Sequence, residues 1–226
     1  MGSYQHVIWD WNGTLLNDVW LCVEVINKLL TARGKDSISH DQYLALFDFP
    51  VKGYYENVGF DFSSESFDAV CTEFCDEYEM RMSECELHRE ALNVLQLCKA
   101  TGIPQSILST TEQGRLNRMV RAFGISDFFE RISGQTNHHA IGKADKGKEL
   151  LASLGLREDR VVLVGDTTHD AQVASGLGIQ CVLTSIGHHP ADKLRSTGFP
   201  VLDRLSDFAN VFNGERQSLG SAEQNR

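Results

Sequence analysis

The chain has 226 residues, of which 42% are hydrophobic and 23% are charged, which suits one globular domain or a core with a smaller inserted domain. Its formal net charge of −10 repels a polyphosphate backbone, so nucleic acid is not an expected partner. No apolar run is long enough to span a bilayer and no charged-then-apolar leader opens the chain, so we expect no membrane partner and a cytoplasmic location.

The first predicted element is a short buried strand. Val7 to Trp9 is an apolar run, and it is closed by Asp10 and then by Asn12-Gly13. An apolar run that stops at polar and turn-forming residues is typical of a buried strand that ends in a turn. Asp10 is therefore expected at the carboxyl end of this strand.

The next part of the chain reads as helices alone. Apolar residues recur at helical spacing over three segments, 18–33, 41–47 and 64–82. No good strand pattern lies between Leu16 and Cys85. We therefore expect residues 17–85 to form an inserted all-helical unit.

After the insertion, strands and helices alternate. The predicted strands are 105–109, 131–133, 161–164 and 180–184, and the predicted helices are 90–100, 115–123, 146–154 and 170–177. Such alternation predicts an α/β fold, a Rossmann-like parallel sheet with helices on both faces. We expect residues 1–16 and 86–212 to form this core and residues 213–226 to be a disordered tail.

Polar side chains follow several of these strands, and parallel sheets place their chemistry at the carboxyl ends of the strands. They are Asp10 with Asn12 and Thr14, Ser109 with Thr110, Asp166 with Asp170, and Lys143, which is expected in the loop before a helix. Each alone has an ordinary structural explanation. An aspartate after a strand usually forms a turn or caps a helix, and a single lysine is most often a solvated surface charge.

The ordered set is more informative than its members. Asp-x-Asn-Gly-Thr at 10–14, a strand that ends in Ser109, Lys143 before a helix, and Gly-Asp-Thr-x-x-Asp at 165–170 resemble the haloacid dehalogenase superfamily of hydrolases. The resemblance covers roughly residues 7–187. The helical unit resembles the cap of that superfamily, and the segment around Asp170 is similar to members of the phosphoglycolate-phosphatase type.

This resemblance implies a mechanism and a metal. Asp10 would attack phosphorus on a small phosphorylated metabolite and form an aspartyl-phosphate. The carboxylates of Asp10 and Asp166 and the backbone carbonyl of Asn12 would bind Mg²⁺, with Asp170 as a further ligand or as a partner of the bound waters. Six cysteines without a Cys-x-x-Cys pair give little support for zinc instead.

Four further residues receive roles from the same resemblance. Lys143 would place a positive charge on the phosphoryl group and on Asp10. The hydroxyl of Ser109 and the amide of Thr110 would donate to phosphoryl oxygens, and Thr14 would hold the loop after the first strand.

One position departs from the family pattern. Related phosphatases usually carry an aspartate two residues after the nucleophile as the general acid and base, and this chain has Asn12. Such help is worth on the order of 10²- to 10⁴-fold in rate. In a first interpretation the protein is a slow phosphatase, or one whose leaving groups need no proton. A histidine could then help, and the candidates are His138, His139, His169, His188 and His189.

Two other interpretations stay open. Phosphonoacetaldehyde hydrolases of the same superfamily also lack this aspartate and use a cap lysine to form a Schiff base, a role for which Lys52 is the candidate. The segment 47–55 is accordingly our expected cap loop at the site. Alternatively, the protein is a non-catalytic phosphoryl-binding or interaction module. The sequence does not indicate an oligomeric state.

Overall fold

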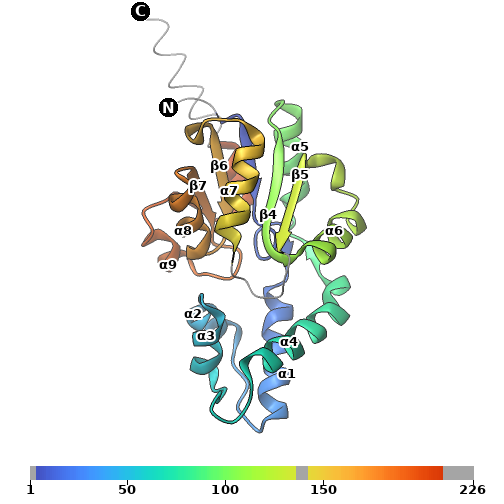
Figure 1. The fold of residues 1–226 in the computed structure, drawn as a ribbon, viewed down its shortest axis with the longest axis vertical. Coiled ribbons are helices and arrows are strands. Elements are labelled where there is room, and N and C mark those ends of the chain that lie inside the picture. Colours follow the sequence, from blue (N-terminus) through green and yellow to red (C-terminus); the bar gives the residue numbers. More distant parts are fainter. Residues whose placement is uncertain (1–3, 136–141, 211–226) are drawn as a thin grey trace, which may run out of the picture.

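The computed structural model describes residues 4–135 and 142–210. Its main sheet has six parallel strands in the order β5–β4–β1–β6–β7–β8 (Figure 1). The strands are β1 (His6–Trp9), β4 (Gln105–Glu112), β5 (Arg131–Gln135), β6 (Val161–Gly165), β7 (Gln180–Thr184) and β8 (Val201–Leu202). The predicted α/β class and parallel sheet are therefore confirmed.

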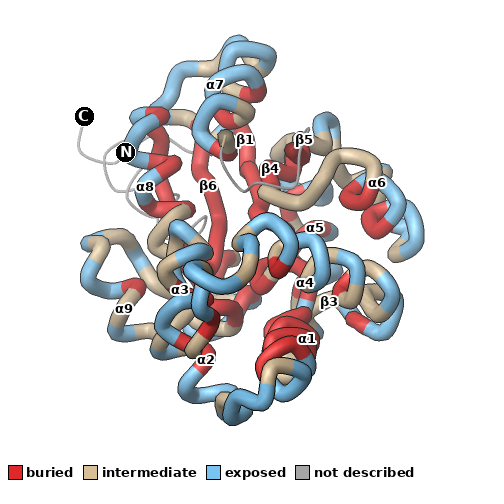
Figure 2. The backbone as a smooth tube through the Cα atoms, turned by 60° about the horizontal axis from the view of Figure 1, so that its bottom comes forward, coloured by how far each residue is buried: buried red, intermediate tan, exposed pale blue. Residues whose placement is uncertain are grey.

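Helices cover both faces of this sheet. Along β1, Val7 and Trp9 belong to one buried apolar cluster, whereas Ile8 between them belongs to another. The first cluster includes side chains of α5 (Ala91–Ala100) and α6 (Gln113–Ala122). The second includes side chains of α7 (Lys143–Leu154), α8 (Thr168–Leu177) and α9 (Ala191–Arg195). Strands β1 and β6 are buried along their length, which explains their continuous apolar runs (Figure 2).

Four helices form the inserted unit below the sheet in Figure 1. They are α1 (Val19–Ala32), α2 (His40–Leu46), α3 (Val51–Val58) and α4 (Phe67–Arg81). The short antiparallel strands β2 (Leu16–Asn17) and β3 (Glu86–Leu87) pair where the chain leaves the core and where it returns. Within the described ranges, no helix is long and apolar enough to cross a membrane.

Two sequence predictions need correction. Lys143 was expected in a loop before a helix that starts at residue 146, but it is the first residue of α7. Residues 47–55 were expected to be a loop, but α3 begins at Val51. A glycine at position 53 and aromatic neighbours weaken the local helical preference. Burial of Tyr54, Tyr55 and Val58 supplies the missing stabilisation.

His6 lies at the amino end of β1, away from Asp10 at the other end, and its burial makes the folding stability sensitive to acid. Its ring is 1% exposed, its Nε2 lies 2.9 Å from the hydroxyl of Ser106, and burial lowers its pKa to about 4. Below pH 6.5 the unfolded chain binds a proton that the folded chain does not, so folding stability falls as the pH drops toward 4.

We expect His6→Asn to lose less stability than the unmodified protein between pH 7.5 and pH 5, by about 1 kcal/mol. Urea unfolding at both pH values measures this difference. The exposed His40, replaced in the same way, should keep the full acid sensitivity. Equal pH slopes for all three proteins would contradict the prediction.

Candidate active site

The site lies where β1 and β6 end side by side. Asp10 directly follows β1 and Asp166 directly follows β6, and the backbone N–H of Asp10 donates to the carbonyl of Val164 at 2.8 Å. Asp170 lies in the first turn of α8, which starts just after β6. Oxygen atoms of Asp10, Asp166 and Asp170 all lie within 4.8 Å of one another, and the three residues are buried.

Lys143 completes this cluster from α7. Its Nζ donates to Asp10 Oδ1 and to Asp170 Oδ1, both at 2.5 Å, and its side chain is 2% exposed. Burial alone would lower the pKa of Lys143, but the two carboxylates outweigh it and raise that pKa above the usual lysine value. The lysine is therefore a cation, and the sequence prediction that it lies beside Asp10 is correct.

Neighbouring residues fix the orientation of the two later aspartates. The Thr14 hydroxyl donates to Asp166 Oδ1 at 2.8 Å, and the backbone N–H of His188 donates to Oδ2 at 2.7 Å. Asp170 Oδ2 accepts from the backbone N–H and the hydroxyl of Thr167 at 3.0 and 2.6 Å. A Cβ atom at Gly13 would collide with the Asp166 carboxylate, so only glycine fits there.

The carboxylates repel one another in this buried setting. Burial and the neighbouring Asp170 and Asp166 charges raise the pKa of Asp10 to about 8, although Lys143 opposes the shift. Burial and Asp170 likewise raise the pKa of Asp166 to about 6. A site that resists carrying its own negative charge is suited to a hard divalent cation with oxygen ligands, such as Mg²⁺.

Asn12 does not point freely into this site. Its Nδ2 donates to Asp18 Oδ2 at 2.7 Å and to the Tyr78 hydroxyl at 3.0 Å. Its Oδ1 accepts from the Thr111 hydroxyl at 2.6 Å. The Tyr78 hydroxyl also donates to Asp18 Oδ2 at 2.7 Å. The Asn12 side chain is thus held by residues from the insertion and from β4.

The structure therefore changes what Asn12→Asp should do. The new carboxylate would face the buried carboxylate of Asp18, so we expect the free energy of unfolding to drop by about 2 kcal/mol at pH 7.5. Thermal and urea unfolding measure the loss. Asn17→Asp adds the same charge at an exposed position nearby and should change stability little. Equal stabilities of the two variants would contradict this reading of the Asn12 contacts.

The remaining predicted site residues lie in different settings. Ser109 is 1% exposed, and its hydroxyl oxygen accepts from the backbone N–H of Thr111 at 3.0 Å, which leaves its own proton to donate. Thr110 is half-buried on β4. Lys52 is 53% exposed on α3, with its Nζ 3.9 Å from Glu56 and 5.9 Å from the ring centre of Phe62. The expectation that Lys52 reaches the site therefore has no geometric support.

The segment 47–50, in contrast, does reach the core. The ring of Phe47 lies 5.2 Å from that of His188, and the ring of Phe49 lies 4.8 Å from that of His169. Asp48 forms an ion pair with Lys193 of α9 at 3.0 Å. The part of the predicted cap loop before α3 thus packs against the carboxyl-end loops of the sheet.

Of the candidate histidines that the structure describes, His188 contacts the carboxylate cluster through its backbone N–H, which donates to Asp166. Its Nε2 is 3.5 Å from Asp18 Oδ1 and its Nδ1 is 2.8 Å from the Tyr43 hydroxyl. Burial alone would lower the pKa of His188, but Asp18, Asp166 and Asp10 raise it to about 9. The ring of His169 is tilted by 31° against that of Phe49, while Nδ1 of His189 accepts from the backbone N–H of Thr168. His138 and His139 lie outside the described residues.

Four neighbours of the site were not among the residues predicted from the sequence, namely Asp18, Tyr43, Tyr78 and Thr111. Asp18 was expected only as the start of a helix. Their contacts join segments 60 to 145 residues apart in the chain, and no local spacing reports such contacts.

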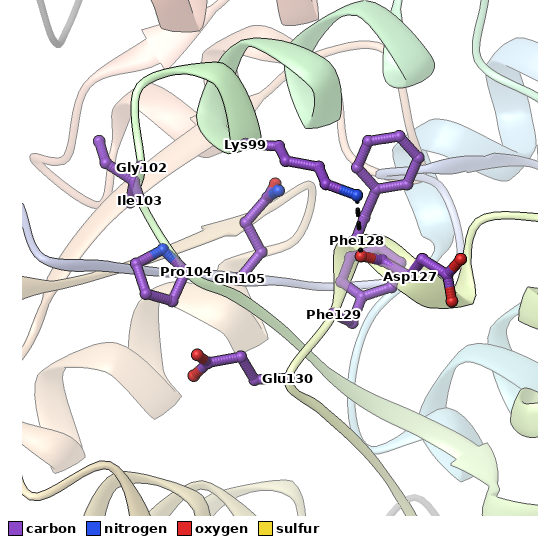
Figure 3. Close-up of a pocket in the computed structure, with 9 residues that line it drawn as sticks. All are labelled: Lys99, Gly102, Ile103, Pro104, Gln105, Asp127, Phe128, Phe129 and Glu130. Atoms are coloured by element: carbon purple, nitrogen blue, oxygen red, sulfur yellow. Dashed lines mark hydrogen bonds between the residues drawn. The ribbon is translucent and has the colours of Figure 1, made fainter.

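A separate pocket lies near the amino ends of β4 and β5, away from the carboxyl ends that carry the aspartates (Figure 3). Its lining residues Gly102 to Gln105 and Asp127 to Glu130 come at or before the amino ends of β4 and β5. The Lys99 amine there donates to the Asp127 carbonyl at 3.4 Å. The aspartate cluster lies at the carboxyl ends of the strands, so this pocket is not part of the candidate active site.

Comparisons with known proteins agree with this geometry. The model of the haloacid dehalogenase-like hydrolase family matches residues 7–184, and the chain belongs to that family. The family predicted from the sequence is thus confirmed.

Several known proteins are similar to this chain in sequence or in fold. The tyrosine-protein kinase PtkA of Mycobacterium tuberculosis is 26% identical over 96% of this chain and 73% of its own length. A phosphoglycolate phosphatase of Rhodobacter capsulatus is 24% identical over 83% of this chain and 88% of its own. A haloacid dehalogenase-like hydrolase from Streptococcus pneumoniae has the same fold, with a TM-score of 0.81 at 18% identity over 94% of this chain and all of the other.

Proposed function

We propose that this protein is a Mg²⁺-dependent phosphohydrolase that acts on a small phosphorylated metabolite through an aspartyl-phosphate on Asp10. The observation that carries the proposal is the buried cluster in which Lys143 bridges Asp10 and Asp170 beside Asp166. A carboxylate nucleophile, a fixed cation and a second set of carboxylates are the parts that phosphoryl transfer needs.

The donor set fits a magnesium ion. The carboxylates of Asp10 and Asp166 and the backbone carbonyl of Asn12 would hold it, and it would offset the repulsion between a carboxylate nucleophile and a phosphate. Asp170 already accepts from Lys143 and Thr167 through both oxygens. We therefore assign Asp170 to the waters around the ion and to Lys143 rather than to direct ligation.

The remaining residues orient the substrate and the nucleophile. Lys143 would bind a phosphoryl oxygen and keep Asp10 in place, and the Ser109 hydroxyl and the Thr110 amide would donate to other phosphoryl oxygens. Thr14 holds Asp166 through its hydroxyl, so we propose that it acts on the metal site rather than on the substrate. The helical insertion, residues 17–85, would act as the cap, with its segment 47–50 over the site.

A phosphate-release screen with and without Mg²⁺ tests the proposal. The names of the relatives suggest phosphoglycolate and an aryl phosphate such as phosphotyrosine as its first two substrates. We expect release that depends on Mg²⁺ and disappears with a chelator. Absence of release from every substrate would favour the non-catalytic module, and a phosphonoacetaldehyde adduct at Lys52, trapped with borohydride, would revive C–P cleavage.

A further inference from the structure

The contacts of Asn12 bear on the second half of the proposed reaction. Both ends of its amide are engaged, the Nδ2 with Asp18 and Tyr78 and the Oδ1 with Thr111. An amide held in this way neither takes up nor releases a proton. Position 12 therefore contributes no acid–base chemistry to a phosphoryl group on Asp10.

Asp18 makes the amide at position 12 a structural requirement. This carboxylate is fully buried, and its Oδ1 accepts from the backbone N–H of Gly13 at 2.8 Å. Its Oδ2 accepts from Asn12 and from Tyr78. A donor at position 12 completes this set, whereas a carboxylate there would bring two negative charges into contact. The Asn12–Asp18 pair thus excludes an acidic residue two positions after Asp10.

The other carboxylates at the site are also committed. Asp166 accepts from Thr14 and from the His188 backbone, and Asp170 accepts from Lys143 and Thr167. The His169 ring lies against that of Phe49, at 4.8 Å between ring centres. His188 also has both ring nitrogens engaged, the Nε2 with Asp18 at 3.5 Å and the Nδ1 with the Tyr43 hydroxyl at 2.8 Å. In the described part of the chain, Asp166, Asp170 and His188 are therefore all held by other partners and are not free to take a proton from a water that attacks phosphorus on Asp10.

We propose that removal of the phosphoryl group from Asp10 is the slow step, so that the phosphorylated protein accumulates during turnover. In the first step a bond forms between an Asp10 oxygen and phosphorus, the ester P–O bond breaks, and the leaving group departs as an anion if it is an aryl oxide. In the second, a water oxygen attacks phosphorus, the Asp10–phosphorus bond breaks, and the water proton passes to solvent. The inference rests on the proposed function, and Asn12 and Asp18 are positioning residues in it.

Rapid mixing with 4-nitrophenyl phosphate and Mg²⁺ tests this inference. An aryl leaving group needs no proton, so the first step should be fast and the second slow. We expect a burst of nitrophenolate close to one equivalent per protein, followed by steady release at least about tenfold slower. Acid quenching during turnover should leave one phosphoryl group on the peptide that contains Asp10, detected by mass.

The outcomes separate the two proposals. Steady nitrophenolate release without a burst and without phosphorylated protein overturns the slow-step inference and leaves the phosphohydrolase proposal standing. No nitrophenolate release and no phosphate release from any substrate overturns both.

A paired exchange tests the structural cause. Asn12→Asp combined with Asp18→Asn conserves the charge and the donor–acceptor pairing of the two side chains. It places a carboxyl two residues after Asp10, so we expect the burst to vanish and steady release to rise at least about tenfold. Tyr78→Phe removes one hydrogen bond and leaves the pair intact, so its burst should persist. A folded exchange variant that keeps the burst would overturn the role of the Asn12–Asp18 pair. If the variant does not fold, the presence or absence of a burst in the unmodified protein still decides whether removal of the phosphoryl group is the slow step.

Discussion

Asp10→Asn is expected to abolish phosphate release, by more than about 10³-fold, because it removes the only atom proposed to attack phosphorus. The same change should stabilise the metal-free protein. Burial and two neighbouring aspartates raise the pKa of Asp10 to about 8, which means that its ionised form is costly in the folded state. A neutral amide of the same shape avoids that cost. We expect a gain on the order of 1 kcal/mol at pH 8.

Phosphate release with Mg²⁺ and thermal unfolding in the presence of a chelator measure the two effects. Asp145→Asn is the matched control, because Asp145 is exposed on α7 and its carboxylate pairs with Lys148 at 3.1 Å. It should change neither quantity appreciably. Loss of activity together with a loss of stability would indicate that Asp10 supports the fold, and retained activity would remove it as the nucleophile.

The sequence predicted the part of the site that follows from strand order. Asp10 and Asp166 directly follow β1 and β6, whose apolar runs are continuous, and Ser109 lies within β4. Parallel strands bring their carboxyl ends to one edge of the sheet. Lys143 was also correctly placed beside Asp10, although its helix begins three residues earlier than expected. These residues depend on the alternation of strands and helices, which local patterns report well.

The contacts between the insertion and the core could not be predicted in this way. Whether Tyr78 meets Asn12, or Phe49 meets His169, depends on how the helical unit docks on the sheet. Helical spacing in α4 gives the buried face but not the partner across the interface. Lys52 was expected at the site because residues 47–55 were predicted to form a loop, whereas the helix α3 places Lys52 one turn from Glu56.

Removal of Mg²⁺ is expected to make folding stability depend on pH between 4 and 8. Without the ion, the folded protein keeps protons on Asp10 and Asp166, whose pKa values are about 8 and 6, while the unfolded chain has released them. At these two carboxyl groups the folded state binds more protons than the unfolded state, so their contribution to stability falls as the pH rises through this range, opposite in sign to that of His6. Bound Mg²⁺ would displace these protons and abolish most of the slope.

The size of the effect follows from mass action. At a free Mg²⁺ concentration about 100 times its dissociation constant, binding adds about 2.7 kcal/mol, which for a chain of this length raises the unfolding temperature by about 5–10 °C. Thermal unfolding from pH 6 to 8.5, with Mg²⁺ or with a chelator, measures both curves. The gap between them should widen toward pH 8, because protons compete with the ion at lower pH.

Asp166→Asn separates a specific site from a general salt effect. It removes one proposed ligand but leaves Lys143, Asp10 and Asp170 in place, so the variant should lose the response to Mg²⁺ while it still folds. Calcium or sodium at equal ionic strength should not reproduce the full shift in unfolding temperature, since Mg²⁺, the smaller divalent ion, suits a compact set of oxygen ligands.

Parallel pH curves with and without Mg²⁺ would contradict the metal site. Lys143 and His188 would then be the cations that balance the four buried aspartates. The raised pKa of Asp10 would in that case leave the proposed nucleophile largely protonated at neutral pH. In this scheme the ion would therefore favour the ionised form of Asp10 as well as bind the phosphate.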